Sequence, residues 1–324
     1  MQLWQALFIG ALQGVSELFP VSSLAHTILI PALLGWGIDQ EANNFLSFVV
    51  ALHLATAIAL VIYFWQDWRA VIKAYVGSIQ RRKLVYDENS KFAWLLVAGT
   101  IVVGAIGLIF EKQLRKFFED PKLYWLVAVF LILNGGVMLY GEYLRQRAAR
   151  LETATDLSKP NKVAARAGGG TMTREAEVGS SVTPQTTRGA EGPLKKVEEL
   201  SFGQGGAIGA TQTLALFPGI SRSGVTMVGG LLAGLSHAAA ARFSFMLATP
   251  VIGLAALLKV PDLFKPAARD MLGTTALAAV LAGVTAYLSV RFLMGYFETK
   301  RLSPFGYYCV AFGVLALVVF QVRG

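Results

Sequence analysis

Long apolar windows dominate this chain and most restrict what it can fold into. They lie at about 44–66, 92–110, 123–141, 238–259, 273–297 and 304–322. A helix needs about 20 apolar residues to cross a bilayer. With 55% hydrophobic and only 15% charged residues, the 324-residue chain also has too little polar surface for a soluble globule. The sequence therefore predicts an all-α, polytopic integral membrane protein.

Two further apolar stretches, near 3–35 and 203–235, are each broken in the middle by polar, turn-prone residues. The region 146–200 is rich in Gly, Thr, Ser and charged residues, so we expect a flexible hydrophilic linker. It separates a first membrane repeat, 1–145, from a second, 201–324. Each repeat has one broken hairpin followed by three full-length windows.

Because three is odd, the second repeat enters from the opposite membrane face if the hairpins are re-entrant, which predicts an inverted repeat. The loop 67–91 is basic, as is the linker, so the positive-inside rule places both in the cytoplasm. The loop 111–122, of mixed charge, is then external. On this topology the two broken segments approach from opposite faces and meet.

The net charge of +9 resides mostly in these loops, which argues against nucleic acid as a partner. The single cysteine, Cys309, excludes an internal disulfide and a Cys-based zinc site.

The first broken segment runs from Gln13 to His26. Gln13 and Glu17 are four residues apart and share one helix face. Pro20 cannot continue that helix without losing a hydrogen bond. The next apolar run, Leu24 to Leu34, follows two serines that are good N-caps.

Ser22 and Ser23 thus stand at a helix start, where backbone N–H groups and the helix dipole favour an anion. His26 lies in the first turn of this helix. The alternative is that the serines only cap the helix and that His26 is an interior histidine with satisfied hydrogen bonds.

The second segment has a break at Pro218-Gly219, an expected turn Ser221-Arg222-Ser223-Gly224 and a helix from Val225. Arg222 is permanently charged, and its planar fork matches phosphate oxygens. Gly219 and Gly224 allow close backbone approach to a ligand. Arg222 could instead reach a lipid headgroup or pair with Glu17.

Ionisable groups in apolar sequence cost about 2.5–3.5 kcal/mol each on insertion scales, which indicates function. Serine hydroxyls, backbone amides and an arginine beside a carboxylate and an imidazole have the parts that phosphoryl transfer needs.

The motifs Gln13-x-x-x-Glu17, Pro20-Val-Ser-Ser-x-x-His26 and Pro218-Gly-Ile-Ser-Arg-Ser-Gly224 resemble those of the bacterial undecaprenyl-diphosphate phosphatase family, also called the bacitracin-resistance family. The resemblance covers nearly the whole chain apart from 146–200. It implies hydrolysis of undecaprenyl diphosphate to the monophosphate and inorganic phosphate, which recycles the lipid carrier of cell-wall synthesis. It also implies a multi-pass protein of the bacterial cytoplasmic (inner) membrane, with an outward-facing site.

The resemblance assigns roles to matching positions. Glu17 and His26 match the essential carboxylate and histidine, Ser23 a nucleophilic serine, and Arg222 a diphosphate-binding arginine. Supporting or substrate-binding positions are Gln13, Ser22, Ser221, Ser223, Gly224 and Thr226. A divalent cation, Mg²⁺ or Ca²⁺, is implied by the resemblance alone, with Glu17 as a possible ligand. The expected partners are undecaprenyl diphosphate and membrane lipid, and a homodimer is left open.

Three features depart from the common pattern. Gln13 stands where many relatives have glutamate, which weakens a metal-ligand role there. Ala25 replaces a common glycine. His53, in a span, occupies a position where glutamine is usual, and is either a site residue or a hydrogen-bonded core residue.

Two other functions compete with the enzyme. Inverted repeats and opposed half-helices also occur in carriers, so a polyprenyl-phosphate transporter is the main alternative. A structural scaffold explains the linker but not the polar residues. Glu17, Ser23 and His26 at one tip favour the enzyme, because a carrier needs no aligned nucleophile and base.

Overall fold

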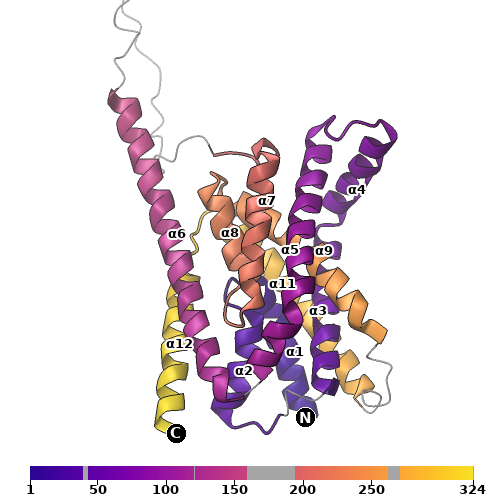
Figure 1. The fold of residues 1–324 in the computed structure, drawn as a ribbon, viewed down its shortest axis with the longest axis vertical. Coiled ribbons are helices and arrows are strands. Elements are labelled where there is room, and N and C mark those ends of the chain that lie inside the picture. Colours follow the sequence, from indigo (N-terminus) through magenta and orange to yellow (C-terminus); the bar gives the residue numbers. More distant parts are fainter. Residues whose placement is uncertain (39–42, 120, 159–193, 262–270, 324) are drawn as a thin grey trace, which may run out of the picture.

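The computed structural model describes residues 1–38, 43–119, 121–158, 194–261 and 271–323 (Figure 1). These are helical apart from turns and one isolated β-bridge, between Lys195 and Leu235. The long helices are α3 (Asn43–Tyr63), α5 (Glu88–Glu119), α6 (Tyr124–Ser158), α9 (His237–Lys259), α11 (Leu272–Phe297) and α12 (Ser303–Arg323). The shorter ones are α1 (Leu3–Leu18), α2 (Ser23–Leu34), α4 (Trp65–Gln80), α7 (Phe202–Thr211), the 3₁₀ helix η4 (Gln212–Leu216) and α8 (Arg222–Leu232).

Within the described part of the chain, five helices are long and apolar enough to cross a membrane, or six if the bent pair α3–α4 counts as one span. The prediction of an all-helical polytopic membrane protein is therefore confirmed. Each expected window corresponds to one of the long helices. Four of them match their windows to within three residues at each end, whereas α5 continues to Glu119 and α6 to Ser158, well past their windows.

Helix α4 is absent from the sequence-based expectation, which treats residues 67–91 as a loop. The chain instead bends by 84° after Tyr63 and continues as a helix to Gln80. The reason is a buried face: Val71, Ala74 and Ser78 recur at helical spacing and are buried. Ser78 also accepts a hydrogen bond from the Trp94 indole of α5 at 3.0 Å.

Ordered structure extends into both ends of the region 146–200 that was expected to be a linker. Helix α6 continues to Ser158, twelve residues past the expected start at 146. Near the other end, Val197 and Leu200 are buried in the core. Residues 159–193, most of the predicted linker, lie outside the described residues.

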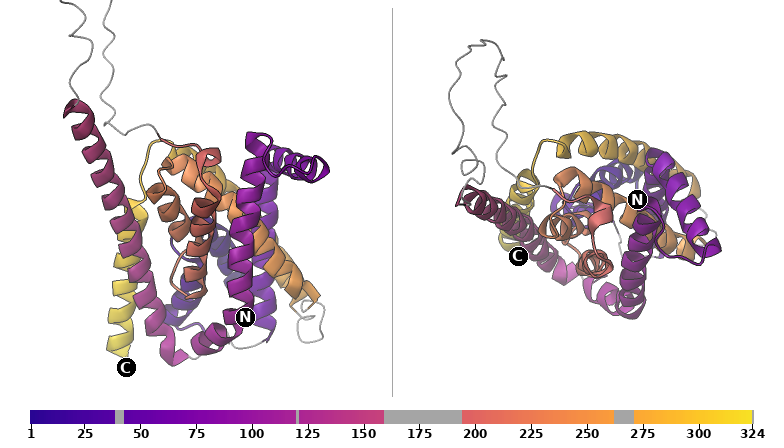
Figure 2. Two further views of the ribbon diagram at one scale, coloured as in Figure 1. Left: turned by 45° about the horizontal axis from the view of Figure 1, so that its top comes forward. Right: turned by 90° about the horizontal axis from the view of Figure 1, so that it is seen from above.

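The two short hairpins enter from opposite ends of the bundle. Figure 1 shows α1 and α2 in the half that contains both termini, and α7 and α8 in the half where α6 ends. The turn after α4 lies at the same end as the end of α6, as the left view of Figure 2 also shows. The basic turn after α4 and the end of α6 thus share one end of the molecule.

Helix α1 is seated on α11 through two glycines one turn apart. A methyl group on Gly10 would lie 2.5 Å from the Ala278 carbonyl oxygen, and one on Gly14 only 2.2 Å from that of Ala282. Small residues allow this close backbone approach, which is typical of helix packing in membranes. The contact fixes the height and rotation of α1 and so the position of Glu17, one turn further on.

Candidate active site

The first break is a tight turn between α1 and α2. Helix α1 ends at Leu18, and Ser22 is the N-cap of α2, accepting from the Ala25 N–H at 3.4 Å. Ser22 has φ +67°, which is uncommon for a residue with a side chain and marks local strain of the kind that clusters at functional sites. Ser23 becomes the first residue of α2. The turn thereby returns the chain so that Ser23 faces the end of α1.

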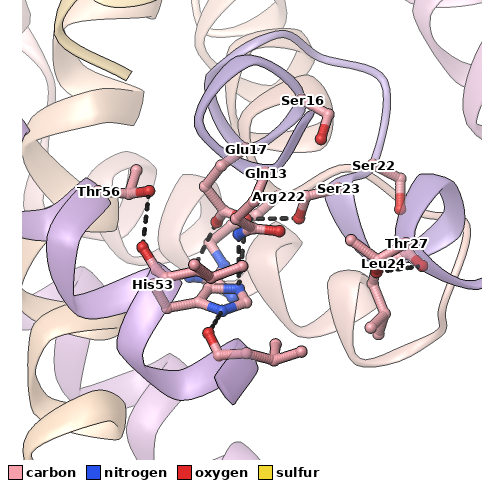
Figure 3. A network of polar contacts seen from close by, with 12 residues as sticks. Gln13, Ser16, Glu17, Ser22, Ser23, Leu24, Thr27, His53, Thr56 and Arg222 are labelled. Carbon is pink, nitrogen blue, oxygen red and sulfur yellow. Dashed lines mark hydrogen bonds and ion pairs between the residues drawn. The ribbon is translucent and has the colours of Figure 1, made fainter. Parts of the chain in front are cut away.

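Glu17 is the centre of the polar network drawn in Figure 3. Its side chain is only 6% exposed. One carboxylate oxygen, Oε2, accepts from the Ser23 hydroxyl at 2.5 Å and from the Gln13 amide at 3.0 Å. The shared helix face of Gln13 and Glu17 is therefore confirmed. A serine that donates a short hydrogen bond to a buried carboxylate is paired with a proton acceptor.

His53, on α3, is the histidine that contacts this carboxylate. Its Nε2 lies 3.4 Å from Glu17 Oε2 and 3.2 Å from the Gln13 amide nitrogen. Its Nδ1 donates to the Val49 carbonyl at 2.8 Å, which fixes the ring and leaves Nε2 facing the site. Of the two interpretations of His53, the geometry supports a site residue.

The second break places Arg222 on the other side of Glu17. Arg222 is the first residue of α8, with Ser221 as N-cap, so this helix begins three residues earlier than expected. Its Nη1 lies 3.9 Å from Glu17 Oε1, too far for a hydrogen bond. Nη1 is buried and has no hydrogen-bond partner among the described residues. The two broken segments therefore meet, and the arginine keeps a donor free for an anion.

The hydroxyls around Arg222 are engaged with the protein. Ser221 and Ser223 lie 3.0 Å apart through their Oγ atoms, and Ser223 also donates to the Phe19 carbonyl at 3.4 Å. Thr226 donates to the Arg222 carbonyl at 2.7 Å. Ser221 Oγ accepts from the Gly224 N–H at 3.2 Å. These residues build the turn that presents Arg222.

Gly219 does not serve a ligand as its sequence context suggested. Its φ of +117° requires glycine, and an added methyl group would lie 2.6 Å from the Val127 carbonyl oxygen and 2.5 Å from Phe130 Cβ. The backbone approaches α6, not an open site. Gly224 also faces protein atoms, because a methyl group added there would lie 3.4 Å from both Pro20 and Asn134.

His26 is held apart from the Glu17 network. Its Nδ1 donates to the Ser22 carbonyl at 2.7 Å, and its Nε2 lies 2.8 Å from the Tyr308 hydroxyl. The ring also stacks on Tyr308 and Phe312 of α12. The described contacts therefore connect His26 to the strained Ser22 and to α12, and none of them connects it to Glu17.

Asn134, on α6, is a site residue that the sequence interpretation missed. Its side chain is fully buried, donates to the Pro20 carbonyl at 3.2 Å and accepts from the Ser221 N–H at 3.0 Å. One side chain thus contacts both turns. A lone asparagine inside an otherwise apolar window was the available signal, because buried polar groups need partners.

The donor set limits how a metal could be held. Among the described residues there is no group of three His, Cys, Asp or Glu side chains that could hold an ion. Glu17 is the one carboxylate that the described contacts place at the site. This fits Mg²⁺ or Ca²⁺ bound through a single carboxylate together with substrate phosphate oxygens, and it does not fit an all-protein cage.

The fold and the site define a class: a multi-pass helical membrane protein with a buried serine–carboxylate pair beside an arginine. Comparison with known proteins is consistent with this class. Residues 6–315 match the family model described as "Bacitracin resistance protein BacA". The chain belongs to this family.

Relatives align over almost the full length of both chains. "Undecaprenyl-diphosphatase 2" of Frankia alni is 45% identical over 342 positions, covering 98% of each chain. "Undecaprenyl-diphosphatase 2" of Burkholderia ambifaria is 41% identical, covering 100% of this chain and 99% of the relative. "Undecaprenyl-diphosphatase" of Mycolicibacterium paratuberculosis is 40% identical, covering 98% and 97%.

Proposed function

We propose that this chain is a membrane undecaprenyl-diphosphatase, which hydrolyses undecaprenyl diphosphate to undecaprenyl phosphate and inorganic phosphate. Full-length similarity to enzymes of that name supports the activity and the substrate. The family description also connects it with bacitracin resistance. The observation that carries the chemistry is the Ser23–Glu17 hydrogen bond of 2.5 Å beside an arginine with an unsatisfied buried donor.

Ser23 is the nucleophile in this mechanism. Its Oγ attacks the terminal phosphorus while its proton passes to Glu17 Oε2. The new O–P bond forms as the bridging P–O bond breaks, and the electron pair leaves with undecaprenyl phosphate. Water then attacks the phosphoserine, one of its protons returns to Ser23, and inorganic phosphate is released. The proton on Glu17 is lost to solvent, which balances the cycle.

Arg222 binds the diphosphate. Its Nη1, which has no hydrogen-bond partner among the described residues, donates to phosphate oxygens and stabilises the charge that develops on them. Helix α2 begins at Ser23 and helix α8 begins at Arg222. The positive dipole ends of both helices therefore favour binding of the diphosphate. His53 Nε2 lies within reach of Glu17 and serves as the next acceptor for its proton.

A divalent cation completes the charge balance in this proposal. Glu17 and the substrate phosphates would hold it, and it would neutralise part of the diphosphate charge. We expect chelation with EDTA to abolish phosphate release and added Mg²⁺ or Ca²⁺ to restore it. Full activity in EDTA after dialysis would remove the cation from the mechanism.

The hairpins α1–α2 and α7–α8 form re-entrant elements of an inverted repeat in this proposal. Their helices have 16, 12, 10 and 11 residues, each short of the about 20 needed to cross a bilayer. Their entry from opposite ends supports the inversion (Figure 1). The basic turn after α4 and the end of α6 lie at one end, which the positive-inside rule assigns to the cytoplasm. The α1–α2 hairpin then opens outward.

Phosphate release from undecaprenyl diphosphate by purified protein in detergent tests the proposal, because detergent removes membrane sidedness. We expect turnover with Mg²⁺ or Ca²⁺ and its loss in Arg222→Ala with folding retained. If the protein releases no phosphate but moves polyprenyl phosphate across liposomes, the transporter alternative is correct.

A further inference from the structure

Asn134 lies between the two turns that form the active site and makes a hydrogen bond to each. The α1–α2 turn carries Ser23 and Glu17, whereas the α7–α8 turn carries Arg222. The two turns come from distant parts of the sequence, and chain connectivity does not hold them together. The distance between the nucleophile Ser23 and the anion-binding Arg222 therefore depends on side-chain hydrogen bonds that connect the two turns.

The side-chain amide of Asn134 supplies a donor to one turn and an acceptor to the other. Nδ2 donates to the Pro20 carbonyl at 3.2 Å, and Oδ1 accepts from the Ser221 N–H at 3.0 Å. A second contact, from Ser223 Oγ to the Phe19 carbonyl, is longer at 3.4 Å. Pro20 breaks the first helix and Ser221 caps the second, so Asn134 contacts each turn at the residue that shapes it.

Burial makes this connection difficult to replace. Asn134 is 0% exposed, and Ser221 is 2% exposed. An apolar side chain at 134 would leave the buried Ser221 N–H without its acceptor and the Pro20 carbonyl with only the long contact from Cys309. Cys309 Sγ lies 3.9 Å from the Pro20 carbonyl and is a weak donor, so it does not substitute.

We propose that Asn134 is a positioning residue for hydrolysis, which acts by fixing Ser23 and Glu17 relative to Arg222. This inference rests on the proposed function. A displacement of about 1 Å between reacting groups can lower a rate by about 100-fold. Loss of the bridge should therefore lower kcat by about 10- to 100-fold. KM should change much less, because Arg222 remains available to bind the diphosphate.

Asn134→Leu removes the two hydrogen bonds to the turns, and the 3.5 Å one from Nδ2 to Cys309 Sγ, with little change in size. Met138→Ala is the matched control: Met138 is equally buried, lies one helical turn further along α6 and donates no hydrogen bond. Both variants should lose stability, but only Asn134→Leu should lose kcat per folded molecule. If Asn134→Leu does not fold, Asn134→Gln keeps the amide but moves it by one methylene, and the same comparison applies.

Two further measurements separate positioning from general stability. In a double-mutant cycle with Arg222→Lys, the two losses in kcat should be strongly non-additive, since both act on the same alignment. Hydrogen exchange at the Ser221 N–H should accelerate in Asn134→Leu and not in Met138→Ala. Additive losses, a kcat equal to that of the control, or unchanged exchange at Ser221 would overturn the inference.

The exchange measurement needs no substrate. Suppose that wild-type protein releases no phosphate but hydrogen exchange at Ser221 still accelerates in Asn134→Leu. The proposed function is then wrong, whereas the structural connection between the two turns through Asn134 is supported. If wild-type protein is active and Asn134→Leu behaves as the control does, the inference fails and the proposed function remains.

Discussion

Glu17→Gln removes the base with little change in shape. The oxygen that accepts from Ser23 at 2.5 Å and from Gln13 at 3.0 Å can be an amide oxygen, which still accepts both hydrogen bonds. The amide cannot take the proton of Ser23 at a useful rate. The substitution therefore separates proton transfer from packing.

The size of the effect follows from the role. A positioned general base contributes about 100- to 10,000-fold to a rate, or about 2.7–5.4 kcal/mol at about 1.36 kcal/mol per factor of ten. We expect kcat to fall within that range. The assay uses saturating Mg²⁺ or Ca²⁺, because Glu17 would also hold the cation in the proposed mechanism. Under that condition KM should not rise, because loss of a negative charge 3.9 Å from Arg222 removes repulsion toward the diphosphate.

Stability should change little. Removing one partner of a buried ion pair can cost about 3–5 kcal/mol, but Arg222 is 27% exposed and the pair is separated by 3.9 Å, so solvent screening makes the loss smaller. The assay is phosphate release with thermal unfolding measured in parallel. Ser16→Ala is the control, since Ser16 donates to the Leu12 carbonyl within α1 at 2.6 Å and not to the site. A Glu17→Gln enzyme that keeps most of the wild-type kcat would refute the assignment of Glu17 as the base.

Three other predictions concern the nucleophile Ser23, the packing of α1 on α11, and His53. Acid-quenched wild-type protein incubated with terminally labelled substrate should carry phosphate on Ser23, whereas Ser23→Ala should carry none and lose activity. Gly14→Ala should lower both Tm and kcat, because the added methyl group overlaps α11, whereas Gly273→Ala meets open space and should change neither. His53→Gln should keep most activity because glutamine can still hydrogen-bond Glu17, whereas His53→Ala should lose more.

Each of these has a contradicting result. Full turnover without labelled serine would replace the covalent step with direct attack by water. Equal Tm values for the two glycine variants would mean that α1 can shift on α11 without strain. An alanine variant of His53 with wild-type kcat would show that the imidazole takes no part in proton transfer.

The membrane architecture could be predicted from the sequence because it depends on local properties. Windows of about 20 apolar residues and the breaks at Pro20 and Pro218 are visible in the chain itself, since lipid requires each spanning segment to satisfy its own backbone. The candidate residues Glu17, Ser23 and Arg222 were likewise recognisable, as charged or nucleophilic groups in apolar surroundings.

Helix α4 shows where this local reasoning ends. Its sequence is polar enough to pass for a loop, and its helical periodicity becomes decisive only because α5 packs against it and its face of Val71, Ala74 and Ser78 is buried. Propensity is a weak guide when a tertiary contact supplies most of the stabilisation.

The tertiary structure alone decided which side chains share the site. The family resemblance favours His26 over His53, but packing against α12 places His26 beside Tyr308, whereas α3 places His53 beside Glu17. Asn134 becomes significant only because α6 brings it into contact with both turns. Residue types and breaks are properties of the chain, but the distances that make a site arise from contacts between helices far apart in sequence.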